Sequence, residues 1–249
     1  MKPAFRIEDF SATHVGEVRS ENEDSFVAVP QSQVWVVADG MGGHVNGKLA
    51  SSTIVAAVAN GTFGASLEQV CDELAETIHA ANAEIYAKSI EAGSQMGSTF
   101  VGLVIRDGEF AVLWSGDSRA YVFRGGQLIQ LTADHTQVQA MIDRGLLTPE
   151  EALTHPMRHV LARAVGVEEE LDIDAVRDFV EPRDLFLLCS DGLYGLVSDD
   201  EIAGILAESG AAACEELIGL CLERGAPDNV TVTLVSVHEP TLLVLGGQS

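Results

Sequence analysis

The chain has 249 residues, of which 47% are hydrophobic, so it can bury a substantial core and does not match the composition of a disordered protein. Its 14 Lys and Arg residues against 38 Asp and Glu give a net charge of −24, which disfavours nucleic acids and anionic membranes as partners. The four cysteines have no Cys-x-x-Cys spacing and are expected to be reduced and mostly buried. No apolar run is long enough to cross a bilayer and the N-terminus lacks a signal-peptide core, so we expect no membrane insertion and a cytoplasmic location.

The first part of the chain predicts strands followed by two helices. Strands are expected over residues 5–15, in the run SFVAV and in the run VWVVA, because each is apolar or alternating and is bounded by polar or turn residues. Helices are expected over 47–58 and 67–89. In the second helix, apolar residues recur every three or four positions, which is the spacing of an amphipathic helix.

Residues 99–131 predict an antiparallel meander. Asp107-Gly108 and Gly125-Gly126 separate alternating apolar runs, and both dipeptides suit two-residue hairpin turns. Residues 134–164 then change character: they contain helical pieces, two prolines and a local concentration of basic residues. We expect this segment, which we call the flap, to lie over a cleft. The alternative is that it packs against the sheet and pairs its basic residues with acids such as Glu150 and Glu151.

The last third predicts further strands over 173–180, 185–189 and 230–237, with helices over 199–208 and 211–224. Strands therefore come in antiparallel runs and helices in sequential pairs. The sequence predicts an α+β fold, specifically a four-layer α/β/β/α sandwich of two mainly antiparallel sheets flanked by helix pairs.

Four aspartates occupy similar positions at the ends of apolar runs. Asp39, Asp117 and Asp191 end the runs VWVVA, FAVLWSG and LFLLCS, and Asp228 precedes the run VTVTLVSV. An aspartate in such a place often only caps the next turn or helix. That explanation does not account for four in the same setting, and convergent carboxylates without Cys or His pairs suit Mg²⁺ or Mn²⁺. The pattern indicates a metal-dependent phosphate enzyme.

A phosphate-binding P-loop is an alternative, because residues 42–48 match Gly-x-x-x-x-Gly-Lys after a strand. The next residue is Leu49, where the motif needs a Ser or Thr hydroxyl for the nucleotide's Mg²⁺. The antiparallel meander also contradicts the parallel sheet of such a fold. In the other interpretation, Asp39 and the Gly40 carbonyl both face a metal ion, and glycine permits the close approach.

An arginine and an acid precede the second strand in the run VGEVRSENEDSF. Arg19 could bind a phosphoryl group through two hydrogen bonds, and Glu23 could hold a metal-bound water. Taken alone, this stretch also suits a solvated charge run in which Arg19 pairs with a neighbouring Glu.

The chain resembles a known family in motifs that span nearly its whole length. In order, the motifs read THVGEVRSENEDSF, VVADGMGGHVNG, MGSTFVGLVI, WSGDSRAYVFRGGQLIQLTADHT, LLCSDGLYGLV and APDNVTVTLV. They are similar to those of the PP2C-type (PPM) metal-dependent serine/threonine protein phosphatases, in their compact bacterial form.

The resemblance implies a role for each matched residue. Asp39 bridges two metal ions, Mn²⁺ or Mg²⁺, and the Gly40 carbonyl binds one of them. Asp191 and Asp228 hold the other, and Glu23 contacts metal-bound water. Two further residues complete the implied site: Arg19 binds phosphate, and Asp117 forms with Asp191 a weaker third metal site.

Two positions depart from the family pattern. Met41 stands where eukaryotic members have a histidine, the proposed general acid, and a thioether cannot donate that proton. His44 is a candidate substitute, although it is equally a loop or helix-start histidine. Gly195 stands where many relatives carry an acid, so one outer metal contact is in doubt.

The resemblance implies a single catalytic domain over residues 1–249, with the flap at 134–164 and a short tail at 239–249. It also implies hydrolysis of phosphoserine and phosphothreonine in proteins by metal-activated water, opposing a bacterial serine/threonine kinase. The expected partners are phosphorylated proteins, including such a kinase or its substrates. The alternative is a pseudophosphatase, a regulatory module that binds phosphoproteins without turnover.

Overall fold

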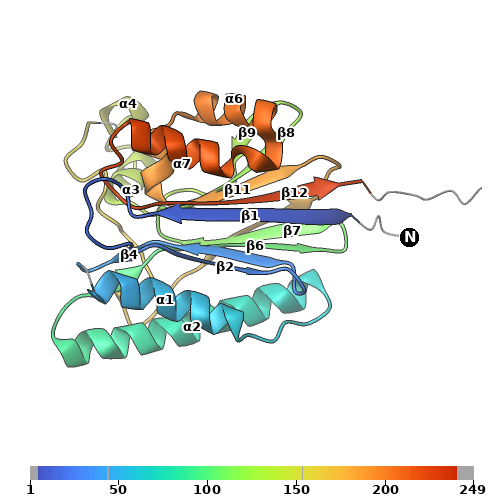
Figure 1. Cartoon of the computed structure of the whole chain (residues 1–249). Helices are drawn as coiled ribbons and strands as arrows, with labels where there is room; N and C mark the ends of the chain where they lie inside the picture. The colour runs from blue at the N-terminus through green and yellow to red at the C-terminus, as the bar shows by residue number, and fades with distance from the viewer. Residues whose placement is uncertain (1–4, 44, 153, 240–249) are drawn as a thin grey trace, which may run out of the picture.

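Two five-stranded sheets stack at the centre of the structure, a computed structural model that describes residues 5–43, 45–152 and 154–239 (Figure 1). The first sheet runs in the order β1 (Arg6–His14), β12 (Val230–His238), β11 (Leu185–Cys189), β8 (Arg119–Arg124) and β9 (Gln127–Gln130). The second runs in the order β10 (Asp174–Phe179), β7 (Glu109–Ser115), β6 (Phe100–Arg106), β3 (Val34–Ala38) and β2 (Ser25–Val29). Every pairing within these two sheets is antiparallel.

Helices cover the outer face of each sheet (Figure 1). The long pair α1 (Val45–Ala59) and α2 (Leu67–Ala92) lies on the second sheet, and α6 (Asp199–Ser209) and α7 (Ala213–Glu223) lie on the first. The short elements are α3 (Gln137–Asp143), α4 (Pro149–Ala152), α5 (Asp191–Tyr194), the 3₁₀ turn η1 (Gly210–Ala212) and the paired two-residue strands β4 (Gly40–Met41) and β5 (Gly97–Ser98). The expected four-layer α+β sandwich is confirmed.

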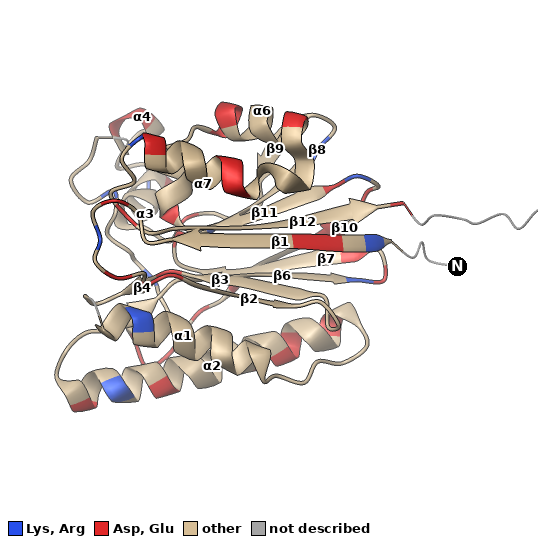
Figure 2. Ribbon diagram, viewed as in Figure 1, with Lys and Arg blue, Asp and Glu red and all other residues tan. Residues whose placement is uncertain are grey.

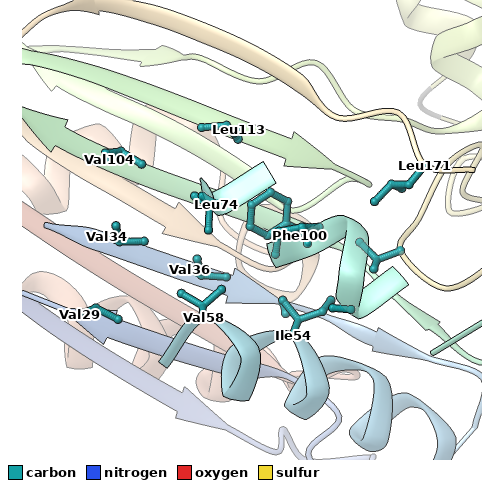
Figure 3. Close-up of a cluster of buried hydrophobic side chains, with 14 of the residues drawn as sticks. Val29, Val34, Val36, Ile54, Val58, Leu74, Phe100, Val104, Leu113 and Leu171 are labelled. Atoms are coloured by element: carbon teal, nitrogen blue, oxygen red, sulfur yellow. The ribbon is translucent and has the colours of Figure 1, made fainter. Parts of the chain in front are cut away.

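The core has three parts, one for each space between layers. Strand β3 shows how one run serves two of them, because its side chains alternate between faces. Val34 and Val36 pack toward α1 and α2 (Figure 3), whereas Trp35 and Val37 pack between the sheets against residues of the facing strands such as Phe186. The third cluster joins β11 and β12 to α5, α6 and α7. A strand buried on both faces reads as a continuous apolar run, which explains the uninterrupted VWVVA.

Both predicted hairpin turns are present. Arg106 pairs with Glu109 and Arg124 with Gln127, so each loop has two residues, and all four loop residues have positive φ. This is the geometry of type I′ turns. The expectation of one continuous meander over 99–131 is wrong, because β7 belongs to the second sheet and β8 to the first. The chain crosses between the sheets through residues 116–118, where tight hydrogen-bonded packing replaces strand pairing.

Acidic side chains lie on α2, α6 and α7, and the basic ones are far fewer (Figure 2). All four cysteines are free thiols. Three are buried and Cys71 is half-buried, and burial raises the pKa of Cys71, Cys214 and Cys221 to about 11. They are therefore unreactive at neutral pH. No helix in the described ranges is both long and apolar enough to cross a membrane.

Candidate active site

A cleft of about 940 Å³ opens where strands and loops of both sheets end. The seven residues singled out from the sequence all line it: Arg19, Glu23, Asp39, Gly40, Asp117, Asp191 and Asp228. They come from positions as far apart as 19 and 228, so only the stacking of the two sheets brings them together. The four strand-end aspartates thus line one cleft.

Asp39 is held by its own backbone at the end of β3. Its N–H donates to Thr99 Oγ1 at 2.9 Å, and its carbonyl accepts from the Thr99 N–H at 2.8 Å and from Ser98 Oγ at 3.0 Å. Gly40 follows in close contact with the first turns of α1, because a Cβ there would lie 2.1 Å from the carbonyl oxygen of Gly47. Glycine is therefore required at this position, and the Asp39-Gly40 pair is fixed in place before any ligand binds.

Asn229 fixes the loop that carries Arg19 and Glu23. Its Oδ1 accepts from the Glu23 N–H at 2.8 Å, and its Nδ2 donates to the carbonyls of Val15 at 2.8 Å and Glu21 at 3.0 Å. This role of Asn229 was not predicted from the sequence. Its position beside Asp228, directly before a strand, was the available signal for such a role.

Arg19 and Asp228 contact each other. Arg19 Nη2 lies 2.7 Å from Asp228 Oδ2, and the pKa of the guanidinium is raised chiefly by this hydrogen bond. The resemblance assigns Arg19 to phosphate and Asp228 to a metal ion. In this structure the two side chains instead neutralise each other's charge. A metal ion at Asp228 would compete with Arg19 for the same carboxylate.

Asp24 is a further carboxyl in the cluster, to which the sequence analysis gave no role. It is almost fully buried, and its Oδ2 accepts from Ser190 Oγ and from Thr231 Oγ1, both at 2.7 Å. Its Oδ1 is buried without a hydrogen-bond donor among the described residues. Because Asp39 is its neighbouring carboxyl, a proton shared between the two would satisfy that atom.

Asp117 and Asp191 complete the cluster from the first sheet. Asp191 opens α5 directly after β11, and Asp117 lies in the crossover between β7 and β8, where its carbonyl accepts from the Tyr194 hydroxyl at 2.8 Å. The neighbouring Ser118 Oγ lies 2.6 Å from Thr99 Oγ1, which also binds Asp39. The backbones of Asp39 and Asp117 are thus joined through two hydroxyl groups.

The carboxyls strongly disfavour being charged together. Burial, followed by the charges of Asp24 and Asp191, raises the pKa of Asp39 well above its ordinary value. Burial, and then Asp191, raises the pKa of Asp117 to about 8. The pKa values of Asp24, to about 6, and of Asp191 are raised as well, again with burial as the first cause. A divalent cation would relieve this repulsion.

The donor set fits a hard divalent cation. It consists of the carboxylate and carbonyl oxygens that line the cleft, the type preferred by Mg²⁺ and Mn²⁺, and the unsatisfied buried oxygen of Asp24 lies behind it, next to Asp39. In the described part of the chain, however, no three His, Cys, Asp or Glu side chains converge as a metal ion requires. The carboxylates would therefore shift to hold an ion, and one of them, Asp228, already pairs with Arg19.

The P-loop alternative is excluded by the structure. Lys48 donates to the carbonyl of Asp24 at 2.8 Å and to Ser25 Oγ at 3.2 Å, so its ammonium group anchors the start of β2. Strand β3 pairs antiparallel with both of its neighbours, β2 and β6. Gly47 packs against the Glu23 carboxylate, since a Cβ on it would lie 2.4 Å from Glu23 Oε2.

The two departures from the family pattern both lie at the cleft. Met41 and Gly195 line it, and neither can donate a proton from its side chain. His44, the candidate general acid, lies outside the described residues. His159 of the flap also lines the cleft.

Comparison with known proteins identifies the family. The protein phosphatase 2C family profile matches residues 14–217. The chain belongs to the protein phosphatase 2C family. It is 37% identical over 225 residues to the serine/threonine protein phosphatase PstP of Mycobacterium tuberculosis, covering 89% of this chain and 43% of that protein. It is 33% identical to the serine/threonine phosphatase stp of Listeria monocytogenes, covering 90% of this chain and 93% of that protein.

Solved structures of bacterial proteins have the same fold as this chain. PppA of Pseudomonas aeruginosa, described as a key regulatory component of T6SS, superposes with a TM-score of 0.87 at 38% identity, covering 94% of this chain and 99% of that one. The PstP catalytic domain in complex with two manganese ions superposes with a TM-score of 0.83 at 34% identity, covering 95% of this chain and all of that one. The chain spans less than half the length of the full Mycobacterium tuberculosis PstP.

Proposed function

We propose that the chain hydrolyses phosphoserine and phosphothreonine in proteins with two Mn²⁺ or Mg²⁺ ions, and that a weaker third ion takes part. The observation that carries this proposal is the convergence of Arg19 with the four strand-end aspartates in one cleft, where the pKa values of Asp39, Asp117 and Asp191 are raised. Such a cluster is costly without cations and suits their binding.

The roles of the chain's own residues follow from their positions. Asp39, the Gly40 carbonyl, Asp191 and Asp228 would hold the two principal ions, with Glu23 beside them. When bound, the ions activate water as a nucleophile and neutralise phosphoryl oxygens. In the structure Arg19 is exposed and sits at the rim beside Asp228. Once released, it can donate two hydrogen bonds to the phosphoryl group and stabilise charge as the seryl or threonyl oxygen leaves.

A single assay separates this function from the pseudophosphatase alternative. The protein is treated with EDTA, and hydrolysis of p-nitrophenyl phosphate and of a phosphothreonine peptide is measured with and without added Mn²⁺. Metal-dependent turnover of both substrates supports the enzyme. Binding of the phosphopeptide without turnover at any Mn²⁺ concentration supports the regulatory module.

The flap is proposed to select protein substrates. Its residues 158–164 line the same cleft as the carboxylates. Arg158 is exposed and its guanidinium pairs with no acid among the described residues, whereas Arg163 Nη1 donates to Asp174 Oδ1 at 2.8 Å. The acid that pairs with Arg163 is thus Asp174, and not Glu150 or Glu151 as the alternative expected. Arg158 is therefore the residue best placed to attract a phosphopeptide.

The remaining proposals concern context. Residues 1–249 are proposed to form one catalytic domain that acts in the cytoplasm against the products of a bacterial serine/threonine kinase. The names of PstP and of the Listeria relative, both serine/threonine phosphatases, support this substrate class. Comparing the phosphoproteomes of cells with and without the protein tests it, because phosphothreonine and phosphoserine sites should accumulate in its absence.

A further inference from the structure

His135 joins three parts of the molecule that meet beside Asp117. It lies just after β9 at the start of the flap, and its side chain is only 10% exposed. Its ring stacks on Trp114 of β7, with centroids 6.0 Å apart and planes inclined by 16°. His135 does not line the cleft, but its side chain hydrogen-bonds the turn that precedes Asp117.

The ring and backbone of His135 bind both sides of the turn that precedes Asp117. The Gly116 N–H donates to His135 Nδ1 at 3.0 Å, and the His135 N–H donates back to the Gly116 carbonyl at 2.9 Å. Gly116 has φ +119, and a Cβ there would lie 2.7 Å from the side chain of Thr99. The turn cannot adopt a regular strand conformation, so the reciprocal pair with His135 replaces strand pairing at this point.

The other ring nitrogen faces away from the turn. Because Nδ1 accepts the hydrogen bond from the Gly116 N–H, the neutral ring carries its hydrogen on Nε2, which donates to Asp174 Oδ2 at 3.0 Å. Asp174 also accepts from Arg163, and the His135 carbonyl accepts from the Ala162 N–H at 2.7 Å. His135 thus connects the turn to β10 and to the returning arm of the flap. Burial lowers the pKa of the ring, which keeps it neutral and preserves this tautomer.

We propose that His135 is a positioning residue, which fixes the Gly116–Asp117 turn through Nδ1 and so aims the Asp117 carboxylate into the cleft. The inference rests on the proposed role of Asp117 at the weaker third ion. A residue that orients a ligand without touching the ion typically affects its affinity. Here one neutral hydrogen bond is at stake, so we expect the loss of Nδ1 to weaken ion binding at Asp117 by about three- to tenfold.

A matched pair of substitutions separates the two ring nitrogens. In His135→Asn the side-chain Oδ1 takes the place of Nδ1 and can accept from Gly116, but the side chain cannot reach Asp174. In His135→Gln the amide nitrogen takes the place of Nε2 and reaches Asp174, but no acceptor remains for Gly116. Asp174→Asn, which alters the Nε2 side alone, serves as the second control.

Two measurements read the result. The first is hydrogen exchange of the Gly116 amide in metal-free protein, followed by NMR, which needs no bound ion. We expect faster exchange in His135→Gln, and rates close to wild type in His135→Asn and Asp174→Asn. The second is the Mn²⁺ concentration needed for full p-nitrophenyl phosphate turnover, which should rise about three- to tenfold only in His135→Gln.

The control variants distinguish failure of the positioning role of His135 from failure of the proposed role of Asp117. Equal effects of Asn and Gln at position 135 on both measurements, or none from either, would overturn the positioning role and leave His135 as packing. Asp117→Asn is measured beside them. If it kept full turnover and wild-type Mn²⁺ dependence, the proposed role of Asp117 would fail, whereas an impaired Asp117→Asn with identical Asn and Gln variants rejects the inference about His135 alone.

Discussion

The carboxyl cluster at the cleft and the flap both reverse the usual distribution of side chains. We call this cluster, which comprises Asp24, Asp39, Asp117, Asp191 and Asp228, the floor. On the floor, carboxyls such as Asp24 and Asp117 are buried, although acids are rarely buried without a partner. On the flap, Leu146, Met157 and Val160 are exposed, by 68%, 37% and 44%. Burying carboxyls and exposing apolar side chains both cost free energy. The proposed binding of metal ions at the carboxyls and of protein substrates at the flap explains both features.

The two regions also differ in how they are held. The floor residues lie at strand ends and are fixed by buried hydrogen bonds from Thr99, Ser190, Thr231 and Asn229. The flap contains two short helices, and its main anchors are at its ends, through His135 and Arg163. The comparison indicates that chemistry depends on a preorganised floor, and that recognition depends on a more adaptable surface.

The largest expected effect comes from removing a carboxylate of the floor. Asp39→Asn and Asp228→Asn should each lower Mn²⁺-stimulated turnover by on the order of a thousandfold, because a lost anionic ligand displaces an ion. Circular dichroism should show intact secondary structure. Steady-state kinetics at saturating Mn²⁺ checks the prediction, and near-wild-type turnover in either variant would reject the two-metal assignment.

The next largest effect is expected from removing the hydrogen bonds that Asn229 makes to the loop bearing Arg19 and Glu23. Asn229→Ala removes three part-buried hydrogen bonds to the backbone of the 15–23 loop, so the free energy of unfolding should fall by about 2–4 kcal/mol. Activity should fall with it, because the loop bearing Arg19 and Glu23 loses its anchor. Denaturant unfolding measures the first effect. Asn60→Ala, which removes only an exposed bond to the Ala56 carbonyl, is the control and should be nearly neutral.

Arg19→Ala should reduce kcat/KM by about ten- to hundredfold, the value of a charged hydrogen bond to the phosphoryl group. The same change frees Asp228, so Mn²⁺ should bind the variant at least as tightly as it binds wild type. Isothermal calorimetry tests the second point and kinetics the first. Unchanged kcat/KM would reduce Arg19 to an ion-pair partner of Asp228.

A smaller effect is expected on the flap, where two arginines form a matched pair. Arg158→Ala should raise KM for a phosphothreonine peptide about three- to fivefold at low salt, with less effect at high salt and p-nitrophenyl phosphate kinetics intact. Arg163→Ala breaks the pair with Asp174, so it should lower the melting temperature and affect both substrates. If Arg158→Ala impaired both substrates equally, the flap would be structural.

The smallest predicted effect is a pH dependence centred on His135. Its pKa is lowered by burial and by the charge of Arg163, against the opposing influence of Asp174 and Asp134. The folded state therefore binds this proton less readily than the unfolded state. Stability is fully present above the unfolded pKa of about 6.5 and is lost as pH falls below it. Melting temperatures from pH 7 to 5 should decline less in His135→Asn than in wild type, and parallel declines would contradict the prediction.

The sequence by itself determined the main elements and the family. Two-residue turns such as Asp107-Gly108 impose hairpins locally, helix periodicity fixes α2, and a strand such as VWVVA that is apolar on both faces can only be central. The ordered motifs around Asp39, Asp117, Asp191 and Asp228 identified the family and the candidate site. These features depend on residues close together in the chain, which is why the sequence reveals them.

The tertiary structure decided what depends on contacts between distant segments. It split the expected meander between two sheets at Gly116, paired Arg19 with Asp228 across 209 positions, and buried Asp24 against Ser190 and Thr231. It also gave His135 and Asn229 their partners. Hydrogen bonds of this kind join groups that have no local pattern in the sequence, and they form only when the stacked sheets bring those groups within about 3 Å of each other.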